Sequence, residues 1–234
     1  MIRASIILSI LTTLFLPINC AFADDYVVMT PDRMTGWEAI GRITFARTGA
    51  PQTCTGTLVT PNKVLTAAHC LSLQFAKGDE AAKHLIFQAG KSGASHIEVT
   101  SVDRISYHPD YAPGSGLENV IPSDLAVLHL QSPVELVQPM QIAAPPEAGE
   151  TVSYLGHRSN GRNPPRLTTG CRQELLTPRI LGIGCQAISG NSGAGVIWTN
   201  SGIKHVVAVI SAAGNGQSYA AIPDGWLFSV LRED

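Results

Sequence analysis

Short segments of strand length, separated by turn residues, run through almost the whole chain. Several alternate apolar and polar side chains, while others are short apolar runs. Turn-forming residues stand between them, and the chain carries 22 glycines and 15 prolines. Such punctuation favours many short strands over long helices, so the sequence predicts an all-β fold. The segments are residues 39–45, 55–60, 63–66, 85–89, 96–102, 125–130, 151–155, 195–198 and 204–211.

A proline-rich connector, residues 139–146, divides these strands into two groups. We therefore predict two β-rich halves, over residues 37–138 and 139–234. The second ends in a helix, because apolar residues in 223–232 recur at helical spacing after a proline-aspartate start. Residues 24–36 form a polar lead-in to which we assign no role.

The first 23 residues have the form of a secretory signal peptide. A short basic start is followed by an apolar run from Ala4 to Leu16 and by Ala21-Phe22-Ala23, which predicts cleavage after Ala23. The alternatives are a membrane anchor and a lipoprotein site at Cys20. The apolar run is short for a bilayer span, and Asn19 is a poor fit to the small residue that precedes a lipidated cysteine. We expect a secreted or periplasmic protein with no membrane association after cleavage.

Four cysteines remain after this cleavage, and an even number in an exported chain predicts disulfides. Spacing alone permits three pairings. The nearest-neighbour pairing closes two short loops, each worth about 3 kcal/mol in the chain-entropy description. We expect no metal site, because the sequence has no C-x-x-C pair and no histidine cluster at ligand spacing. These cysteines are Cys54, Cys70, Cys171 and Cys185.

The charge balance argues against two classes of partner. The net charge is −2 and no basic run is present, so nothing predicts a nucleic acid or an anionic membrane as partner. The hydrophobic fraction of 44% fits a protein with a substantial core. We expect a monomer that acts on proteins or peptides.

Three motifs carry candidate chemistry. His69 follows Thr66-Ala67-Ala68, Asp124 precedes an apolar strand, and Ser192 stands in the turn Gly190-Asn191-Ser192-Gly193. Each motif alone is weak evidence, because isolated histidines, strand-capping aspartates and glycine-serine turns are common. In the order His, Asp, Ser they are much more specific.

These segments resemble the trypsin/chymotrypsin-like serine peptidases over most of the chain after Trp37. Residues 57–60 and 66–70 are similar to the family's histidine block, and residues 107–111 with 123–126 are similar to its aspartate block. A cysteine pair brackets the histidine loop. The resemblance implies two six-stranded antiparallel barrels, the first over residues 37–138 and the second over 139–234, with the active site between them and no cofactor.

The resemblance also implies a role for each site residue. Ser192 would attack the peptide carbonyl, His69 would act as base and then acid, and Asp124 would orient the imidazole. The backbone N–H groups of Gly190 and Ser192 would form the oxyanion hole. Ser211 would support Asp124. The strand Ser211-Ala212-Ala213 would pair with the substrate backbone, and a Cys54–Cys70 bond would brace the loop of His69.

The sequence departs from the trypsin pattern at two positions. Asn191 replaces the aspartate that pairs with a new N-terminus, and the turn looks more like that of the bacterial branch that includes glutamyl endopeptidases. We predict activity without an N-terminal ion pair. Gln186 replaces the acid of the trypsin specificity pocket, and Val209-Ile210 offers no histidine of the glutamyl type. We therefore favour uncharged residues at P1.

Two other functions remain open at this stage. The fold could serve as a binding module in a catalytically silent pseudo-protease, although such proteins usually lose a catalytic residue or an oxyanion glycine. An esterase on the same scaffold would share the catalytic residues and differ only in its pocket.

Overall fold

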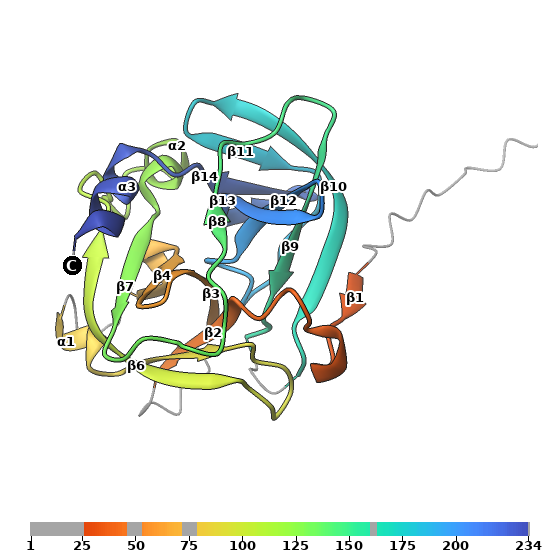
Figure 1. Cartoon of the computed structure of the whole chain (residues 1–234). Helices are drawn as coiled ribbons and strands as arrows, with labels where there is room; N and C mark the ends of the chain where they lie inside the picture. Colours follow the sequence, from red (N-terminus) through yellow and green to blue (C-terminus); the bar gives the residue numbers. More distant parts are fainter. Residues whose placement is uncertain (1–25, 46–52, 72–78, 160–162, 234) are drawn as a thin grey trace, which may run out of the picture.

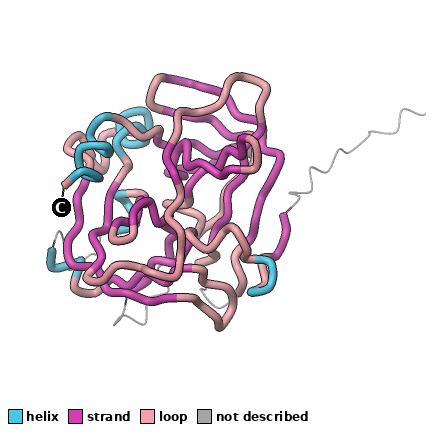
Figure 2. The backbone as a smooth tube through the Cα atoms, viewed as in Figure 1, coloured by secondary structure: helices cyan, strands magenta, loops and turns pink. Residues whose placement is uncertain are grey.

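The computed structural model describes residues 26–45, 53–71, 79–159 and 163–233. It consists mainly of strands joined by loops, with a few short helical segments (Figure 2). The predicted signal peptide and its cleavage site lie outside the described residues. Among the helices of the described ranges, none has the length and apolar character needed to cross a bilayer.

The first six-stranded sheet closes on itself as a barrel, in the order β2-β3-β4-β7-β6-β5. Every pairing in it is antiparallel. Buried and partly buried side chains alternate along much of β2, whereas all residues of β4 and β7 are buried. The strands are β2 (Ile40–Phe45), β3 (Thr53–Thr60), β4 (Lys63–Thr66), β5 (Leu85–Ala89), β6 (Glu98–Tyr107) and β7 (Ala126–Leu130).

A second closed ring of six antiparallel strands follows, because β9 pairs with both β10 and β12. The ring runs β9-β10-β11-β14-β13-β12 (Figure 1). The prediction of two six-stranded antiparallel barrels is therefore confirmed. The strands are β9 (Thr151–Gly156), β10 (Arg166–Thr177), β11 (Ile180–Ile183), β12 (Gly195–Asn200), β13 (Ile203–Gly214) and β14 (Gln217–Ala221).

Two short strands extend the second barrel. In the polar lead-in, β1 (Tyr26–Val28) pairs with β10, so this segment adds a strand to the sheet. Within the proline-rich connector, β8 (Gln141–Ile142) pairs in parallel with β13. The connector therefore lies against the barrel that it introduces.

The C-terminal helix α3 (Gly225–Arg232) begins at Asp224, whose side chain accepts a hydrogen bond from the backbone N–H of Trp226. Its buried residues Leu227 and Val230 belong to the core cluster that contains the first-barrel residues. Lys63 of β4 donates to the carbonyl oxygen of Leu231 at 3.2 Å. The helix thus follows the second barrel in sequence but packs on the first (Figure 1).

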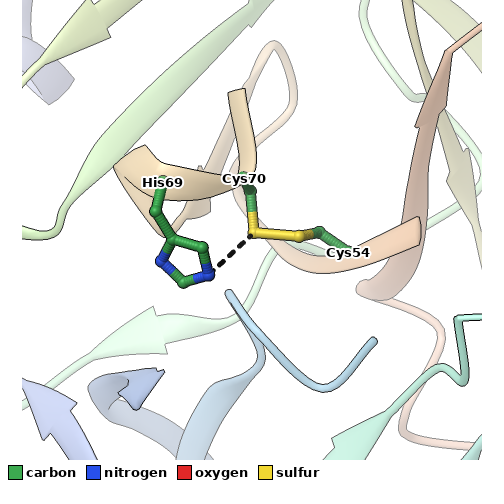
Figure 3. Close-up of side chains that lie close together, drawn as sticks. All are labelled: Cys54, His69 and Cys70. Carbon is green, nitrogen blue, oxygen red and sulfur yellow. Dashed lines mark hydrogen bonds between the residues drawn. A yellow bond between two sulfur atoms is a disulfide. The ribbon is translucent and has the colours of Figure 1, made fainter. Parts of the chain in front are cut away.

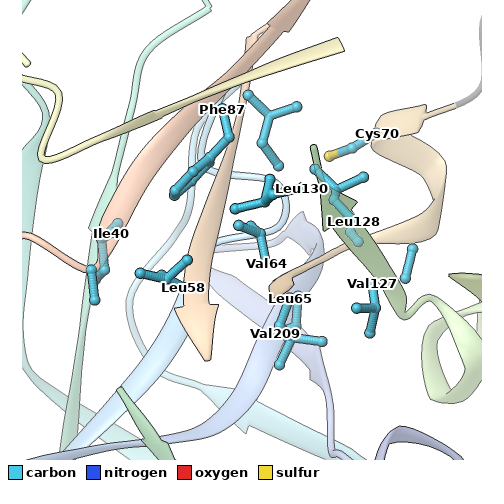
Figure 4. Close-up of a cluster of buried hydrophobic side chains, with 14 of the residues drawn as sticks. Ile40, Leu58, Val64, Leu65, Cys70, Phe87, Val127, Leu128, Leu130 and Val209 are labelled. Atoms are coloured by element: carbon cyan, nitrogen blue, oxygen red, sulfur yellow. The ribbon is translucent and has the colours of Figure 1, made fainter. Parts of the chain in front are cut away.

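The larger core cluster fills the first barrel and continues into the contact between the barrels. Ile40, Leu58 and Phe87 are fully buried in it, and Val209 of the second barrel joins them (Figure 4). This contact fixes how segments from the two barrels meet. The remaining short helical elements are η1 (Pro31–Arg33), η2 (Ala68–Leu71), α1 (Asp79–Ala82), α2 (Leu117–Val120) and η3 (Ile121–Ser123).

Candidate active site

His69 lies in the single turn η2, directly after the buried strand β4. Its backbone N–H donates to Asp124 Oδ1 at 2.9 Å, and its Nδ1 lies 2.6 Å from Asp124 Oδ2. A carboxylate can only accept hydrogen bonds, so Nδ1 carries the proton of a neutral ring. Nε2 is then the atom that can accept a proton. The histidine side chain is 36% exposed, whereas that of Asp124 is 1% exposed.

Asp124 stands between η3 and β7 with its carboxylate inside the protein. Ser211 of β13 donates to its Oδ2 at 2.5 Å, in addition to the two donors of His69. A buried carboxylate needs such donors to offset its lost hydration. Ser211 reaches it from the second barrel, so the predicted support of Asp124 matches an observed hydrogen bond.

Ser192 lies in the turn that precedes β12, and its two flanking glycines have conformations that other residues rarely adopt. Gly190 has φ +99° and Gly193 has φ +79°. A Cβ on Gly190 would lie 2.5 Å from the backbone nitrogen of Ser159, and one on Gly193 would lie 2.2 Å from Thr66 Oγ1. Both conformation and space therefore require glycine at these positions.

Two carbonyl groups of this turn, those of Ser189 and Asn191, accept hydrogen bonds from backbone N–H groups. Ser159 donates its backbone N–H to the Ser189 carbonyl at 3.1 Å, and Ala194 donates to the Asn191 carbonyl at 2.9 Å. In a trans peptide the C=O and the following N–H point in opposite directions. In the described residues, the N–H groups of Gly190 and Ser192 donate no hydrogen bond, so both remain available.

His69, Gly190 and Ser192 line one cavity of about 190 Å³, the catalytic cavity. No hydrogen bond joins Nε2 of His69 to the Ser192 hydroxyl within the described ranges. The polar neighbour recorded for Nε2 is Cys70 Sγ at 3.9 Å (Figure 3). Catalytic hydrogen bonds are often long before substrate binds, and His69 and Ser192 both line this cavity.

A neighbouring cavity of about 240 Å³ also reaches Ser192, and we call it the specificity cavity. None of the described residues that line it carries a charge. Ser218 lies behind its wall, where it accepts from the Ala187 N–H and donates to the Cys185 carbonyl, both at 2.7 Å. The four predicted substrate-binding residues, Gln186, Ser211, Ala212 and Ala213, all line it. The other lining residues are Ala187, Ile188, Ser189, Ser192 and Ile210.

The cysteines are joined as Cys54–Cys70 and Cys171–Cys185. The first bond connects β3 to the turn of His69, and Figure 3 shows the sulfur atoms beside the imidazole. The two sulfurs and the ring lie close enough to form a ligand cluster. Because the sulfurs are joined to each other, neither is a thiolate that could bind a metal.

Asn191 is 4% exposed, and its side-chain amide makes two hydrogen bonds to backbone groups. Nδ2 donates to the His157 carbonyl and Oδ1 accepts from the Ile188 N–H, both at 2.9 Å. The amide therefore links the turn of residues 190–193, called the nucleophile turn below after the predicted role of Ser192, to the segment after β9 without any charge. Sequence reasoning identified the missing aspartate but not these bonds.

Sequence reasoning also missed Thr55 and His157, which contact the nucleophile turn from outside its own segment. Thr55 donates its hydroxyl to the Gly190 carbonyl at 2.9 Å, and the backbone of His157 accepts from Asn191. Nothing in the sequence around these residues marks them, apart from the position of Thr55 beside Cys54.

Two closed six-stranded antiparallel barrels, with a histidine-aspartate pair from the first facing a serine turn of the second, have the architecture of the chymotrypsin fold. A family model described as Trypsin matches residues 27–224, so the chain belongs to the trypsin family of serine peptidases.

The chain is also similar to individual relatives. Chymotrypsin-C of Bos taurus is 34% identical over 97 residues, which is 42% of this chain and 33% of that protein. Trypsin of Saccharopolyspora erythraea is 30% identical over 111 residues, or 47% of each chain. The matches thus span less than half of these relatives. A solved structure of a Glu endopeptidase in complex with MPD shares the fold, with a TM-score of 0.70, 18% identity and coverage of 89% of this chain and 95% of that one.

Proposed function

We propose that this protein is an exported serine endopeptidase in which His69, Asp124 and Ser192 form the catalytic triad. One observation carries the proposal: Asp124 Oδ2 lies 2.6 Å from Nδ1 of His69, and the same imidazole lines one cavity with Ser192. Nε2 is then the ring atom that can accept the serine proton. The N–H groups of Gly190 and Ser192, which donate no hydrogen bond in the described residues, further support this role for the cavity.

In the proposed reaction, Nε2 of His69 takes the proton of the Ser192 hydroxyl as its oxygen attacks the peptide carbonyl. The C–N bond then breaks, the departing amine receives that proton from the imidazolium, and an acyl-enzyme remains. Water repeats the sequence with His69 again as base, and the acid product leaves. Asp124 keeps the proton on Nδ1 and stabilises the imidazolium without itself becoming protonated.

The oxyanion of each tetrahedral intermediate would be bound by the N–H groups of Gly190 and Ser192. Their lack of an acceptor in the described structure supports this role. Donors fixed in advance need no reorganisation during the reaction, and each is typically worth about 10²–10³ in rate.

An extended substrate would add a strand to β13. Its pairing with β12 ends at Val209, while its pairing with β14 continues to Gly214. One edge of residues 211–214 thus has no partner strand in the described ranges, which supports main-chain docking there. The P1 side chain would enter the specificity cavity. Because the residues that line it are uncharged, we propose a preference for uncharged P1 residues.

Activity would not depend on an ion pair with a newly formed N-terminus. The hydrogen bonds of Asn191 already satisfy its buried amide and tie the nucleophile turn in place. A chain with an N-terminal extension should therefore match the trimmed chain in kcat. Inactivity of the extended chain until it is trimmed would contradict this proposal.

Export is supported by the signal-like N-terminus and by the two disulfides, which persist in oxidising compartments. Membership of the trypsin family, together with the catalytic and specificity cavities of this chain, supports proteins or peptides as substrates.

The test is labelling with a serine-directed phosphonylating reagent, followed by peptide mapping. We expect modification of Ser192 in the wild-type chain, and its loss in His69→Ala and Ser192→Ala. Ser189→Ala is the matched control, because Ser189 lines both cavities without a proposed catalytic role. Absence of labelling in the folded wild-type chain would overturn the proposal in favour of a binding module. Cleavage of small esters but of no peptide in a diverse library would favour an esterase.

A further inference from the structure

Thr55 is a fully buried polar residue of β3, and it connects the first barrel to the nucleophile turn of the second. Its backbone N–H donates to the carbonyl oxygen of Ser192 at 2.9 Å. Its hydroxyl donates to the carbonyl oxygen of Gly190, also at 2.9 Å. One residue therefore holds two carbonyl groups of the turn.

The Thr55 hydroxyl has a third partner, the backbone N–H of His157, which donates to it at 3.0 Å. A hydroxyl can donate once and accept at the same time. Removing it would leave a carbonyl and an N–H of the second barrel without this partner, in a region where His157 and Gly190 are both buried. A buried backbone group that loses its hydrogen-bond partner either moves to find another or destabilises the conformation of the turn that holds it.

Gly190 is the residue most open to such movement. Its φ of +99° is accessible because it is glycine, and glycine has little conformational preference of its own. The peptide before it is held by the bond from Ser159 to the Ser189 carbonyl. The peptide after it is held at its carbonyl by the Thr55 hydroxyl and at its N–H by the Ile188 carbonyl, which accepts from Asn191 at 2.9 Å. Rotation at Gly190 would change the angle between these two peptides, and with it the direction of the Gly190 N–H relative to the Ser192 N–H.

Thr55 is also joined to the proposed base through the chain. Its neighbour Cys54 is bonded to Cys70, which follows His69. A short covalent path thus runs from His69 to Thr55, and two hydrogen bonds continue it to the turn of Ser192. The hydroxyl of Thr55 can therefore set the position of the oxyanion donors relative to the base.

We propose that the Thr55 hydroxyl is a positioning group for the oxyanion hole, which it orients by holding the carbonyl of Gly190 from the opposite barrel. This role rests on the proposed peptidase function. Thr55 does not touch the substrate in this proposal; it acts through the peptide units on either side of Gly190.

The test compares Thr55→Val, which replaces the hydroxyl with a methyl group, with Thr55→Ser, which keeps it. Thr55→Ala is a second removal that adds no methyl beside the Gly190 carbonyl. The matched control is Thr57→Val on the same strand, because Thr57 is 1% exposed and its hydroxyl has no partner in the described structure. Thermal melts establish that each variant is folded. Peptides selected from a library by the wild-type chain serve as substrates, and a peptide boronic acid mimics the tetrahedral intermediate.

We expect Thr55→Val and Thr55→Ala to lower kcat by about 10–100-fold with little change in KM. A misplaced N–H donor weakens mainly the hydrogen bond to the oxyanion, which forms only in the transition state. Binding of the boronic acid should weaken by a similar factor. Thr55→Ser should remain within about threefold of the wild type, a rescue that a purely structural role would not predict for kcat.

A folded Thr55→Val or Thr55→Ala variant with wild-type kcat would overturn the proposal. So would a Thr55→Ser variant as impaired as Thr55→Val, or an equal loss in Thr57→Val. Failure of the proposed function itself gives a different result, because the wild-type chain would then cleave no peptide, or Ser192→Ala would cleave as well as the wild type.

Discussion

The side-chain amide of Asn191 donates a 2.9 Å hydrogen bond to the backbone carbonyl of His157. It thereby links the nucleophile turn to the loop that follows β9. Gly156 makes room for this contact, since a Cβ there would lie 2.1 Å from Asn191 Nδ2. The turn is thus held by an uncharged amide at the position where the trypsin pattern has an aspartate that forms an ion pair.

Asn191→Asp should therefore impair this protein. One oxygen of the new carboxylate would face the His157 carbonyl, an acceptor facing an acceptor, and the buried charge would keep the Ile188 N–H as its donor. We expect kcat to fall by about 10-fold or more and the melting temperature to decrease. The measurements are steady-state kinetics and thermal unfolding. Unchanged values for both would show that the amide donor has no role.

Ser211→Ala tests the support of Asp124. Loss of the 2.5 Å hydrogen bond to Oδ2 removes a donor from a buried carboxylate, and hydrogen bonds to charged groups are worth about 1.5–3 kcal/mol. We expect kcat to fall by about tenfold with a small change in KM. Ser123→Ala is the control, because its hydroxyl bonds to backbone carbonyls of Asn119 and Val120. Equal losses in both variants would contradict the assignment.

Removal of the two disulfides should separate stability from catalysis. They span similar sequence separations, 16 and 14 residues, so each double Cys→Ala variant should lose about 3 kcal/mol of unfolding free energy. Loss of Cys54–Cys70 should also lower kcat, because that bond links the His69 turn to Thr55. Loss of Cys171–Cys185 should mainly raise KM, because Cys185 precedes Gln186 of the specificity cavity. Denaturant titration and kinetics test this, and identical kinetic effects would argue against it.

Two buried histidines should make the fold sensitive to acid. Burial, with the charges of Arg42 and Lys91, lowers the pKa of His157 from 6.5 to about 3. Burial, with Arg104 and Lys63, lowers the pKa of His129 to about 4. The unfolded chain binds more protons at these sites between pH 6.5 and the folded pKa values, so unfolding free energy decreases as pH falls through that window.

Each pKa unit of separation corresponds to about 1.4 kcal/mol, so His157 alone should account for several kcal/mol near pH 3. Denaturant titrations from pH 7 to pH 3 measure this loss. His157→Leu should flatten the dependence, whereas His96→Gln, at an exposed position, should leave it unchanged. A stability that does not change over this range would contradict burial of neutral imidazoles.

Gln186→Asp tests the specificity cavity. A carboxylate among its uncharged lining residues should favour Lys or Arg at P1 by charge complementarity. We expect kcat/KM for Arg substrates to rise by about tenfold or more, and that for uncharged P1 residues to fall. Gln186→Asn is the uncharged control. A P1 preference unchanged in Gln186→Asp would show that the P1 side chain does not enter the specificity cavity.

The strands that sequence patterns could identify are those whose burial is regular. β2, β4, β5 and β7 are short and largely buried or alternate in burial, so their patterns appear in the sequence. β10 was not predicted, because most of its side chains are exposed and its pairing with β9 and β11 shifts register. β1 pairs with β10 across more than a hundred residues, a partnership that no local pattern indicates.

The sequence by itself determined the all-β class, the two halves and the three motifs with candidate chemistry, because strand periodicity and glycine-flanked turns are local properties. Only the tertiary structure decided the hydrogen bonds of Ser211 and Thr55, which of the three cysteine pairings forms and where helix α3 packs. Each of these depends on contacts between residues far apart in the chain. Thr55 and Gly190 are 135 positions apart, and a hydrogen bond over that separation exists only once both barrels have closed and packed together.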